Sequence, residues 1–62
     1  MKRILRMADL VEMLGIPKTS LRRLVDAGSF PQPVRLGPRL IGWRASEVEE
    51  WLESRERVAV RP

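Results

Sequence analysis

The 62-residue sequence contains no cysteine and no histidine. The missing cysteines exclude disulfide bonds, and the two absences together exclude zinc sites built from Cys and His. They also exclude catalytic triads that depend on histidine. A chain this short without such staples depends on one compact hydrophobic core. We therefore expect a single domain in residues 1–56 and a C-terminal tail in residues 57–62.

Long apolar runs are also missing. No run approaches the roughly 20 apolar residues of a membrane-spanning helix. The N-terminal Met-Lys-Arg-Ile-Leu-Arg returns to charge after two apolar residues, which does not fit a secretory signal. With 44% hydrophobic and 32% charged residues, the composition is typical of a soluble globular protein. We expect a cytoplasmic protein without a membrane partner.

Basic side chains dominate most of the chain, which carries twelve Lys and Arg against eight Asp and Glu for a net charge of +4. Residues 1–44 hold nine basic and three acidic residues, a net charge of +6. Residues 45–62 hold three basic and five acidic residues, a net charge of −2. Arg outnumbers Lys ten to two, and the forked guanidinium suits phosphate and guanine. This distribution predicts a polyanionic partner on one side of the molecule.

The stretch from Gly15 to Gly28 has the start and stop signals of a short helix. We place this helix at residues 17–27, with Pro17 at its first position, where no N–H is needed. Gly28 can adopt the left-handed conformation that ends a helix. One face is apolar at helical spacing and consists of Leu21, Leu24 and Val25.

The other face of this helix is polar, and its side chains suit base edges and phosphates. It consists of Lys18, Thr19, Ser20, Arg22, Arg23 and Asp26. The alternative interpretation is an ordinary solvated helix face.

A preceding helix of about two turns, ending at Gly15, is predicted by helical apolar spacing. Its apolar residues are Met7, Leu10, Val11 and Leu14. The short connection to the next helix indicates a helix-turn-helix, although the same pattern occurs in a plain helical hairpin. Before this helix, Ile4 and Leu5 are expected to form an extended arm or edge strand.

After Gly28 the chain changes character, because Pro31 and Pro33 do not fit a helix. Two short β-prone runs flank Gly37-Pro38-Arg39, which is typical of a turn. We predict a two-stranded hairpin, the wing, in residues 34–43. Arg39 is expected at its tip, with Arg35 on one arm and Arg44 at the end of the other, and such wings contact the DNA backbone or a minor groove.

A last helix is predicted from Ser46, where Ser46 and Glu49 form a capping box, to about Arg55. Its expected buried stripe consists of Val48, Trp51 and Leu52. Its exposed remainder is acidic and should face away from DNA because phosphate repels it. These acidic residues are Glu47, Glu49, Glu50, Glu53 and Glu56.

The large apolar residues are few and should form one core. They are Trp43, Trp51, Phe30, Leu10, Leu14, Leu21, Leu24, Val48 and Leu52. An alternative role for the two tryptophans is stacking on bases. Their positions, in a helical stripe and at a strand end, favour the core.

Particular residues resemble the AlpA family, small phage- and prophage-encoded regulators related to excisionases and to the winged helix-turn-helix of MerR-type proteins. The resemblance lies in Phe30-Pro31-Gln32-Pro33-Val34-Arg35-Leu36-Gly37-Pro38-Arg39, Ile41-Gly42-Trp43-Arg44 and Ser46-Glu47-Val48-Glu49-Glu50-Trp51-Leu52. It implies a mainly α fold with a small β-hairpin, a winged helix-turn-helix of three helices and a two-stranded wing. Family members usually have Ser at the position of Pro17, and an aromatic residue is common at the position of Arg22.

The resemblance implies a protein that binds double-stranded DNA in a sequence-specific manner, with helix 17–27 in the major groove. Such a protein acts as a transcriptional regulator, as an excisionase, or as both. The expected DNA-binding residues are Lys18, Thr19, Ser20, Arg22, Arg23, Arg35, Arg39 and Arg44. The resemblance also implies a bacterial protein associated with the nucleoid. We expect no enzymatic activity, cofactor or metal, and a monomer that assembles side by side on DNA. The alternative is a protein-interaction module whose acidic last helix docks an integrase or other recombinase, or RNA polymerase.

Overall fold

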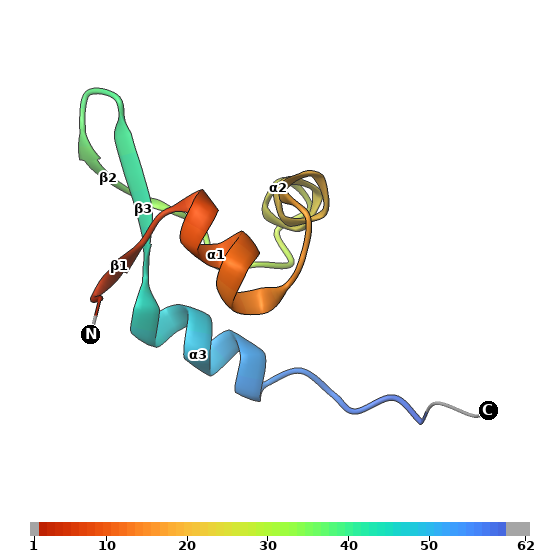
Figure 1. Ribbon diagram of the computed structural model, residues 1–62. Helices are drawn as coiled ribbons and strands as arrows, with labels where there is room; N and C mark the ends of the chain where they lie inside the picture. Colours follow the sequence, from red (N-terminus) through yellow and green to blue (C-terminus); the bar gives the residue numbers. More distant parts are fainter. Residues whose placement is uncertain (1, 60–62) are drawn as a thin grey trace.

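The computed structural model describes residues 2–59, which form three α-helices and a three-stranded antiparallel sheet (Figure 1). In chain order these are β1 (Ile4–Leu5), α1 (Met7–Leu14), α2 (Lys18–Asp26), β2 (Val34–Gly37), β3 (Leu40–Arg44) and α3 (Ala45–Glu53). The predicted winged helix-turn-helix is thus confirmed. Residues 1 and 60–62 of the predicted domain and tail lie outside the described residues. Among the described residues, no helix has both the length and the apolar character to span a bilayer.

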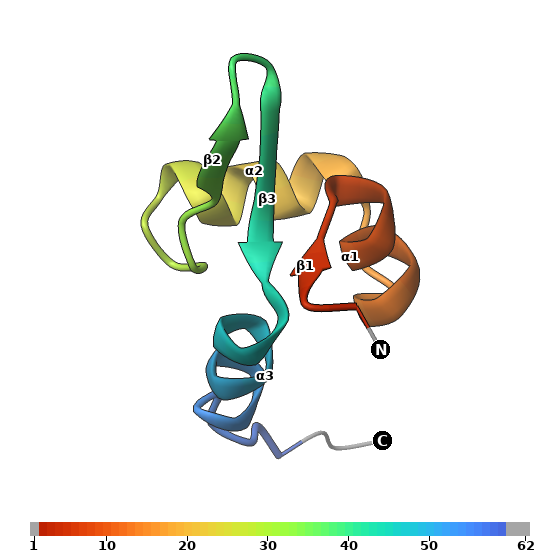
Figure 2. The ribbon, with the colours of Figure 1, turned by 90° about the vertical axis from the view of Figure 1, so that its left-hand side faces the viewer.

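The strand order β1-β3-β2 makes the sheet larger than the predicted two-stranded wing. The expected edge strand at Ile4 and Leu5 is confirmed, since these residues pair with Arg44 and Trp43. In the hairpin, Arg35 pairs with Ile41 and Gly37 with Leu40, with a bulge between Arg35 and Gly37. Figure 2 shows that the hairpin extends well beyond β1 and projects from the body of the domain.

The helix ends follow local backbone chemistry. α2 ends in a Schellman motif, in which the N–H of Ser29 donates to the Leu24 carbonyl at 2.8 Å and that of Gly28 to Val25 at 3.0 Å. Gly28 has φ +74°, which confirms the predicted left-handed end. Pro17 is the N-cap rather than the first helical residue, with ψ 149°. Its carbonyl still accepts from the Leu21 N–H at 3.1 Å, so the helix begins one residue later than predicted.

The predicted capping box at Ser46 and Glu49 is wrong, because α3 begins at Ala45 with Arg44 as its N-cap. β3 continues directly into α3, and the Ala45 N–H donates to the Arg3 carbonyl at 2.9 Å. Pairing with the strand before α1 therefore sets the start of this helix, and Ser46 lies inside it. α3 ends at Glu53, two residues before the expected Arg55.

The structure has a side-chain cap at the start of α1, where Asp9 accepts a hydrogen bond from the backbone that precedes the helix. The backbone N–H of Arg6 donates to Asp9 at 2.8 Å, and Lys2 Nζ lies 2.6 Å from the same carboxylate. The hydrogen bond from Lys2, together with that from Arg6, lowers the pKa of Asp9, and the Asp9 carboxylate raises the pKa of Lys2. The cap therefore stabilises α1 at neutral pH and is lost in acid, as the carboxylate takes up a proton at its lowered pKa.

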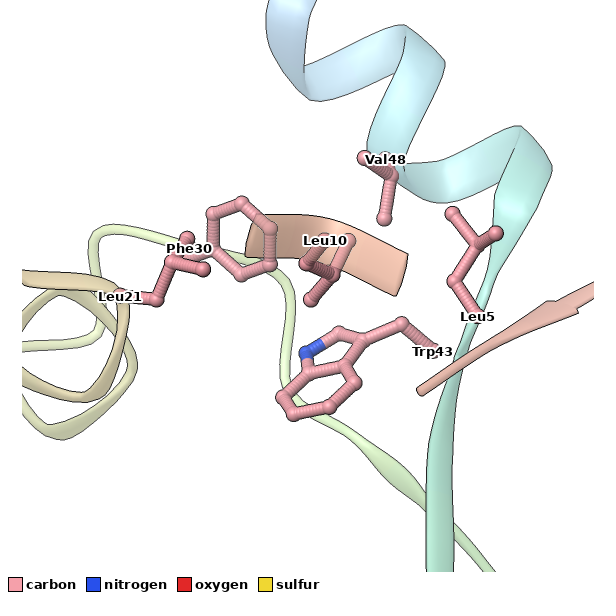
Figure 3. Close-up of a cluster of buried hydrophobic side chains, with 6 residues drawn as sticks. All are labelled: Leu5, Leu10, Leu21, Phe30, Trp43 and Val48. Carbon is pink, nitrogen blue, oxygen red and sulfur yellow. The ribbon is translucent and has the colours of Figure 1, made fainter. Parts of the chain in front are cut away.

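The core lies where α1, α2 and α3 meet the sheet, and Figure 3 shows its side chains converging. Its buried residues are Leu5, Leu10, Leu21, Phe30, Trp43 and Val48. Leu14, Leu24 and Trp51 are partly buried against it, as expected. Leu52 is wrong as a core residue, because 53% of it is exposed. α3 is seated through Val48 and Trp51, and Leu52 lies about 100° around the helix from Trp51.

We predict that Gly42→Ala destabilises the domain by about 1–3 kcal/mol, a typical cost of overpacking. A Cβ at Gly42 would lie 2.6 Å from Ile4 Cγ2 and 3.2 Å from the Leu5 carbonyl oxygen. Gly37→Ala is the matched control, since its Cβ would meet only the Leu40 Cβ, at 3.6 Å. Urea unfolding followed by tryptophan fluorescence checks both. Equal midpoints for the two variants would contradict the close packing of β1 against β3.

Candidate nucleic-acid interface

Most of the predicted DNA-binding residues of α2 are exposed. Leu21 is fully buried and fixes the inner face of the helix. Thr19 and Arg23 lie one turn apart on the opposite face, and they are exposed together with Lys18 and Arg22. Ser20 is only partly exposed, because it lies next to Leu21 at the edge of the buried face. The exposed Asp26 adds one negative charge at the end of the same face.

The hairpin holds two of its three predicted cations near its tip. Arg39 is exposed in the two-residue turn between β2 and β3. Arg35 is also exposed, and its guanidinium donates to the Pro38 carbonyl at 3.1 Å. Arg35 therefore braces the turn that presents Arg39.

Exposed apolar side chains are a feature of the wing that the sequence interpretation missed. Leu36, Leu40 and Ile41 are 47%, 40% and 41% exposed. Leu36 occupies the bulge and Leu40 begins β3 directly after the turn. The two β-prone runs predicted the strands, but they gave no sign that the hairpin projects beyond the core.

Arg44 does not lie with the other predicted residues, because it is at the opposite end of β3 from the turn. It pairs with Ile4 and shares an open pocket of about 530 Å³ with Lys2, Arg3 and Glu49. Lys2 and Arg3 were noted in the sequence only as part of a basic N-terminal run. The sequence predicted an edge strand at Ile4 and Leu5 but not that it pairs with β3, which is the pairing that brings Lys2 and Arg3 beside Arg44.

A cluster of three aromatic rings connects α2 to the wing. The Trp43 indole N–H donates to the Pro31 carbonyl and the Trp51 indole N–H to the Ser29 carbonyl, both at 2.7 Å. Phe30, between these two carbonyls in sequence, packs edge-on against Trp51 and Trp43 with ring centroids 4.7 and 6.3 Å apart. The loop that leaves α2 is thus fixed to β3 and to α3.

These contacts exclude the alternative in which the tryptophans stack on bases. Trp43 is only 2% exposed. Trp51 is half-buried, contacts Phe30 and has the Arg55 guanidinium 5.0 Å from its ring centroid. Both rings pack in or against the core and donate hydrogen bonds to the loop after α2.

The acidic helix lies away from the hairpin tip. In both views the tip and α2 occupy the upper part of the molecule and α3 the lower part (Figures 1 and 2). All five glutamates in and after α3 are exposed. Within residues 2–59 the ion pair is Lys2–Asp9, so the cations of α2 and of the wing have no carboxylate partner there. The charge separation seen in the sequence is therefore a separation in space.

Comparison with known proteins places this arrangement in a family. The family described as "Prophage CP4-57 regulatory protein (AlpA)" matches residues 3–56. The chain is also 32% identical over 54 residues to "Uncharacterized protein ORF88" of Enterobacteria phage P4. That match covers 87% of this chain and 61% of the phage protein, so the chain spans about three-fifths of its relative's length. The chain belongs to the AlpA family of phage regulatory proteins.

Proposed function

We propose that this chain is a non-enzymatic regulator that binds double-stranded DNA in a sequence-specific manner. The observation that carries the proposal is the exposed polar face of α2, where Lys18, Arg22 and Arg23 have no carboxylate partner within residues 2–59. Unpaired cations that face solvent release condensed counterions when they meet phosphates, which supplies affinity. Membership in a phage regulatory family supports the same function.

In this proposal α2 enters the major groove. Thr19 and Arg23 point away from Leu21 and contact base edges, while Lys18 and Arg22 flank them and contact phosphates or guanine. Ser20, being partly covered, contacts the edge of the groove. Directing prophage excision and controlling transcription would both use this surface, on different DNA sites.

The wing is proposed to lie on the backbone or in the adjacent minor groove. Arg39 at the turn contacts phosphate, and Arg35 holds the turn through the Pro38 carbonyl. The exposed Leu36 and Leu40 suit contact with deoxyribose, since apolar side chains are common where proteins enter a minor groove. Arg44, at the far end of β3, reaches DNA only where the duplex bends toward it.

A second candidate function is docking of a recombinase or of RNA polymerase through α3. The exposed glutamates of α3 favour it, because none has a cationic partner within residues 2–59. Selection of duplexes from a random pool, followed by mobility shift at physiological salt, separates the two functions. A chain that enriches no sequence and shifts no duplex is a protein-interaction module only.

We predict that Arg23→Ala weakens binding to the selected duplex by about 1–3 kcal/mol and relaxes preference at one base pair, as expected for loss of a bidentate base contact. Arg23→Lys keeps the charge but loses the planar fork, so it should retain nonspecific binding and lose the preference. Mobility-shift titrations on the selected duplex and on a scrambled one measure both. Unchanged affinity in Arg23→Ala would remove Arg23 from the interface.

We predict that Arg39→Ala weakens all duplexes about equally, because a phosphate contact carries no sequence information. The slope of log affinity against log salt should decrease by about one. Arg39→Lys should restore most of the affinity, since a point charge suffices for phosphate. Titrations at several salt concentrations test this, and an effect confined to one base position would contradict it.

A further inference from the structure

An open groove of about 630 Å³ lies between α3 and the loop that leads into β2. Its apolar lining consists of half-buried side chains, those of Pro31, Pro33, Val34 and Trp51. Two exposed carboxylates, Glu47 and Glu50, line it as well. We call this surface the α3–loop groove. It suits an extended segment that carries both apolar and cationic side chains.

The groove is preformed on its loop side. The Trp51 and Trp43 indoles hold the Ser29 and Pro31 carbonyls at 2.7 Å, so the loop pays little ordering cost when a ligand binds. Its carboxylates are unused, because neither Glu47 nor Glu50 has a cationic partner within residues 2–59. A bound cation would therefore replace water and break no existing ion pair.

The chain itself contains a segment of this chemistry. After α3 the sequence reads Arg55-Glu56-Arg57-Val58-Ala59-Val60-Arg61-Pro62, which contains three arginines and two valines and only one acidic residue. Residues 56–59 have no regular secondary structure and lead away from the body of the domain (Figure 1). Val58 is 75% exposed. An exposed valine between arginines matches the apolar and acidic lining of the groove.

The same copy cannot easily supply this segment to its own groove. Ser54 itself lines the groove, so the chain would have to reverse direction soon after it to fill the same groove. Arg55 opposes such a reversal, because its guanidinium lies 5.0 Å from the Trp51 ring centroid and its Nε donates to the Trp51 carbonyl at 3.3 Å. The segment is therefore available to a second copy.

We propose that the segment that follows α3 in one copy, with Arg57 and Val58, docks in the α3–loop groove of the next copy when copies bind neighbouring DNA sites. This inference rests on the proposed DNA-binding function. A segment this short binds weakly in solution, but two copies on one duplex experience an effective concentration in the millimolar range. The contact thus joins copies on DNA and leaves the free protein a monomer.

The first test uses the full chain, labelled with ¹⁵N, and a synthetic peptide of residues 55–62. The Trp51 indole N–H resonance should shift as peptide is added, with a Kd on the order of 1 mM. The Trp43 indole is buried and does not line the groove, so its resonance should shift less than that of Trp51, which provides an internal comparison. Absence of a Trp51 shift up to several times that concentration would overturn the proposal.

Two matched variants test the site within the groove. Glu50→Lys should weaken peptide binding about tenfold, whereas Glu53→Lys makes the same charge change on α3 outside the groove lining and should have little effect. Equal losses in both variants would show general attraction between an acidic helix and a basic peptide, and would refute a specific groove.

The second test measures cooperativity on duplexes that carry one or two copies of the selected site. Glu50→Lys and Val58→Asp should each reduce two-site cooperativity several-fold and leave single-site affinity unchanged. Failure of the unmodified chain to bind the single-site duplex would instead refute the proposed DNA-binding function. Peptide binding without any change in cooperativity would assign the groove to another protein's segment. The Trp51 resonance of Val58→Asp can also be compared with that of the unmodified chain, in dilute solution without peptide. A difference there would show that the groove holds the copy's own segment. Either result overturns the proposal.

Discussion

The contact of Phe30 with the two tryptophans is the constraint on which the rest of the structure depends. Phe30 is 3% exposed and follows directly on the Schellman motif that ends α2. Edge-on aromatic pairs contribute about 0.5–1.5 kcal/mol beyond burial, and here two pairs share one ring. The two indole hydrogen bonds hold the carbonyls on either side of Phe30. The loop therefore cannot swing, and the orientation of the hairpin relative to α2 is fixed.

This constraint matters because the domain has little else to hold it. Six hydrophobic side chains form the buried core within residues 2–59, and without cysteine no disulfide supplements them. A domain of this size has only a few kcal/mol of stability, so each close contact counts. The approach of β1 to Gly42 is one such contact, and it also carries the basic N-terminal residues to Arg44. Packing and charge placement are thus determined by the same strand pairing.

The sequence predicted those elements whose signals are local. Apolar spacing placed α1, Gly28 ended α2, and Gly37-Pro38-Arg39 marked the turn. The errors have a common cause, which is tertiary contact overriding local pattern. Ser46 reads as a cap, but pairing of Ala45 with Arg3 starts α3 earlier. Leu52 fits the helical stripe, but the hydrogen bond from the Trp51 indole to the Ser29 carbonyl orients α3 so that Leu52 faces solvent. Of the site residues, local pattern gave the exposed face of α2, whereas the separation of Arg44 from Arg39 required the sheet register.

The acidic helix α3 also affects the charge balance of the domain itself. Residues 1–44 carry a net charge of +6 in a very small volume, and such a charge destabilises a compact state by self-repulsion. Glutamates on α3 reduce this repulsion without forming ion pairs with the cations of α2 within residues 2–59. In both views α3 lies in the lower part of the molecule, away from the hairpin tip and α2 (Figures 1 and 2). The cations remain available to a polyanion, and the field of the molecule is asymmetric. In the proposed complex, an asymmetric field would orient the domain so that α2 and the wing face the duplex and the α3–loop groove faces away from it.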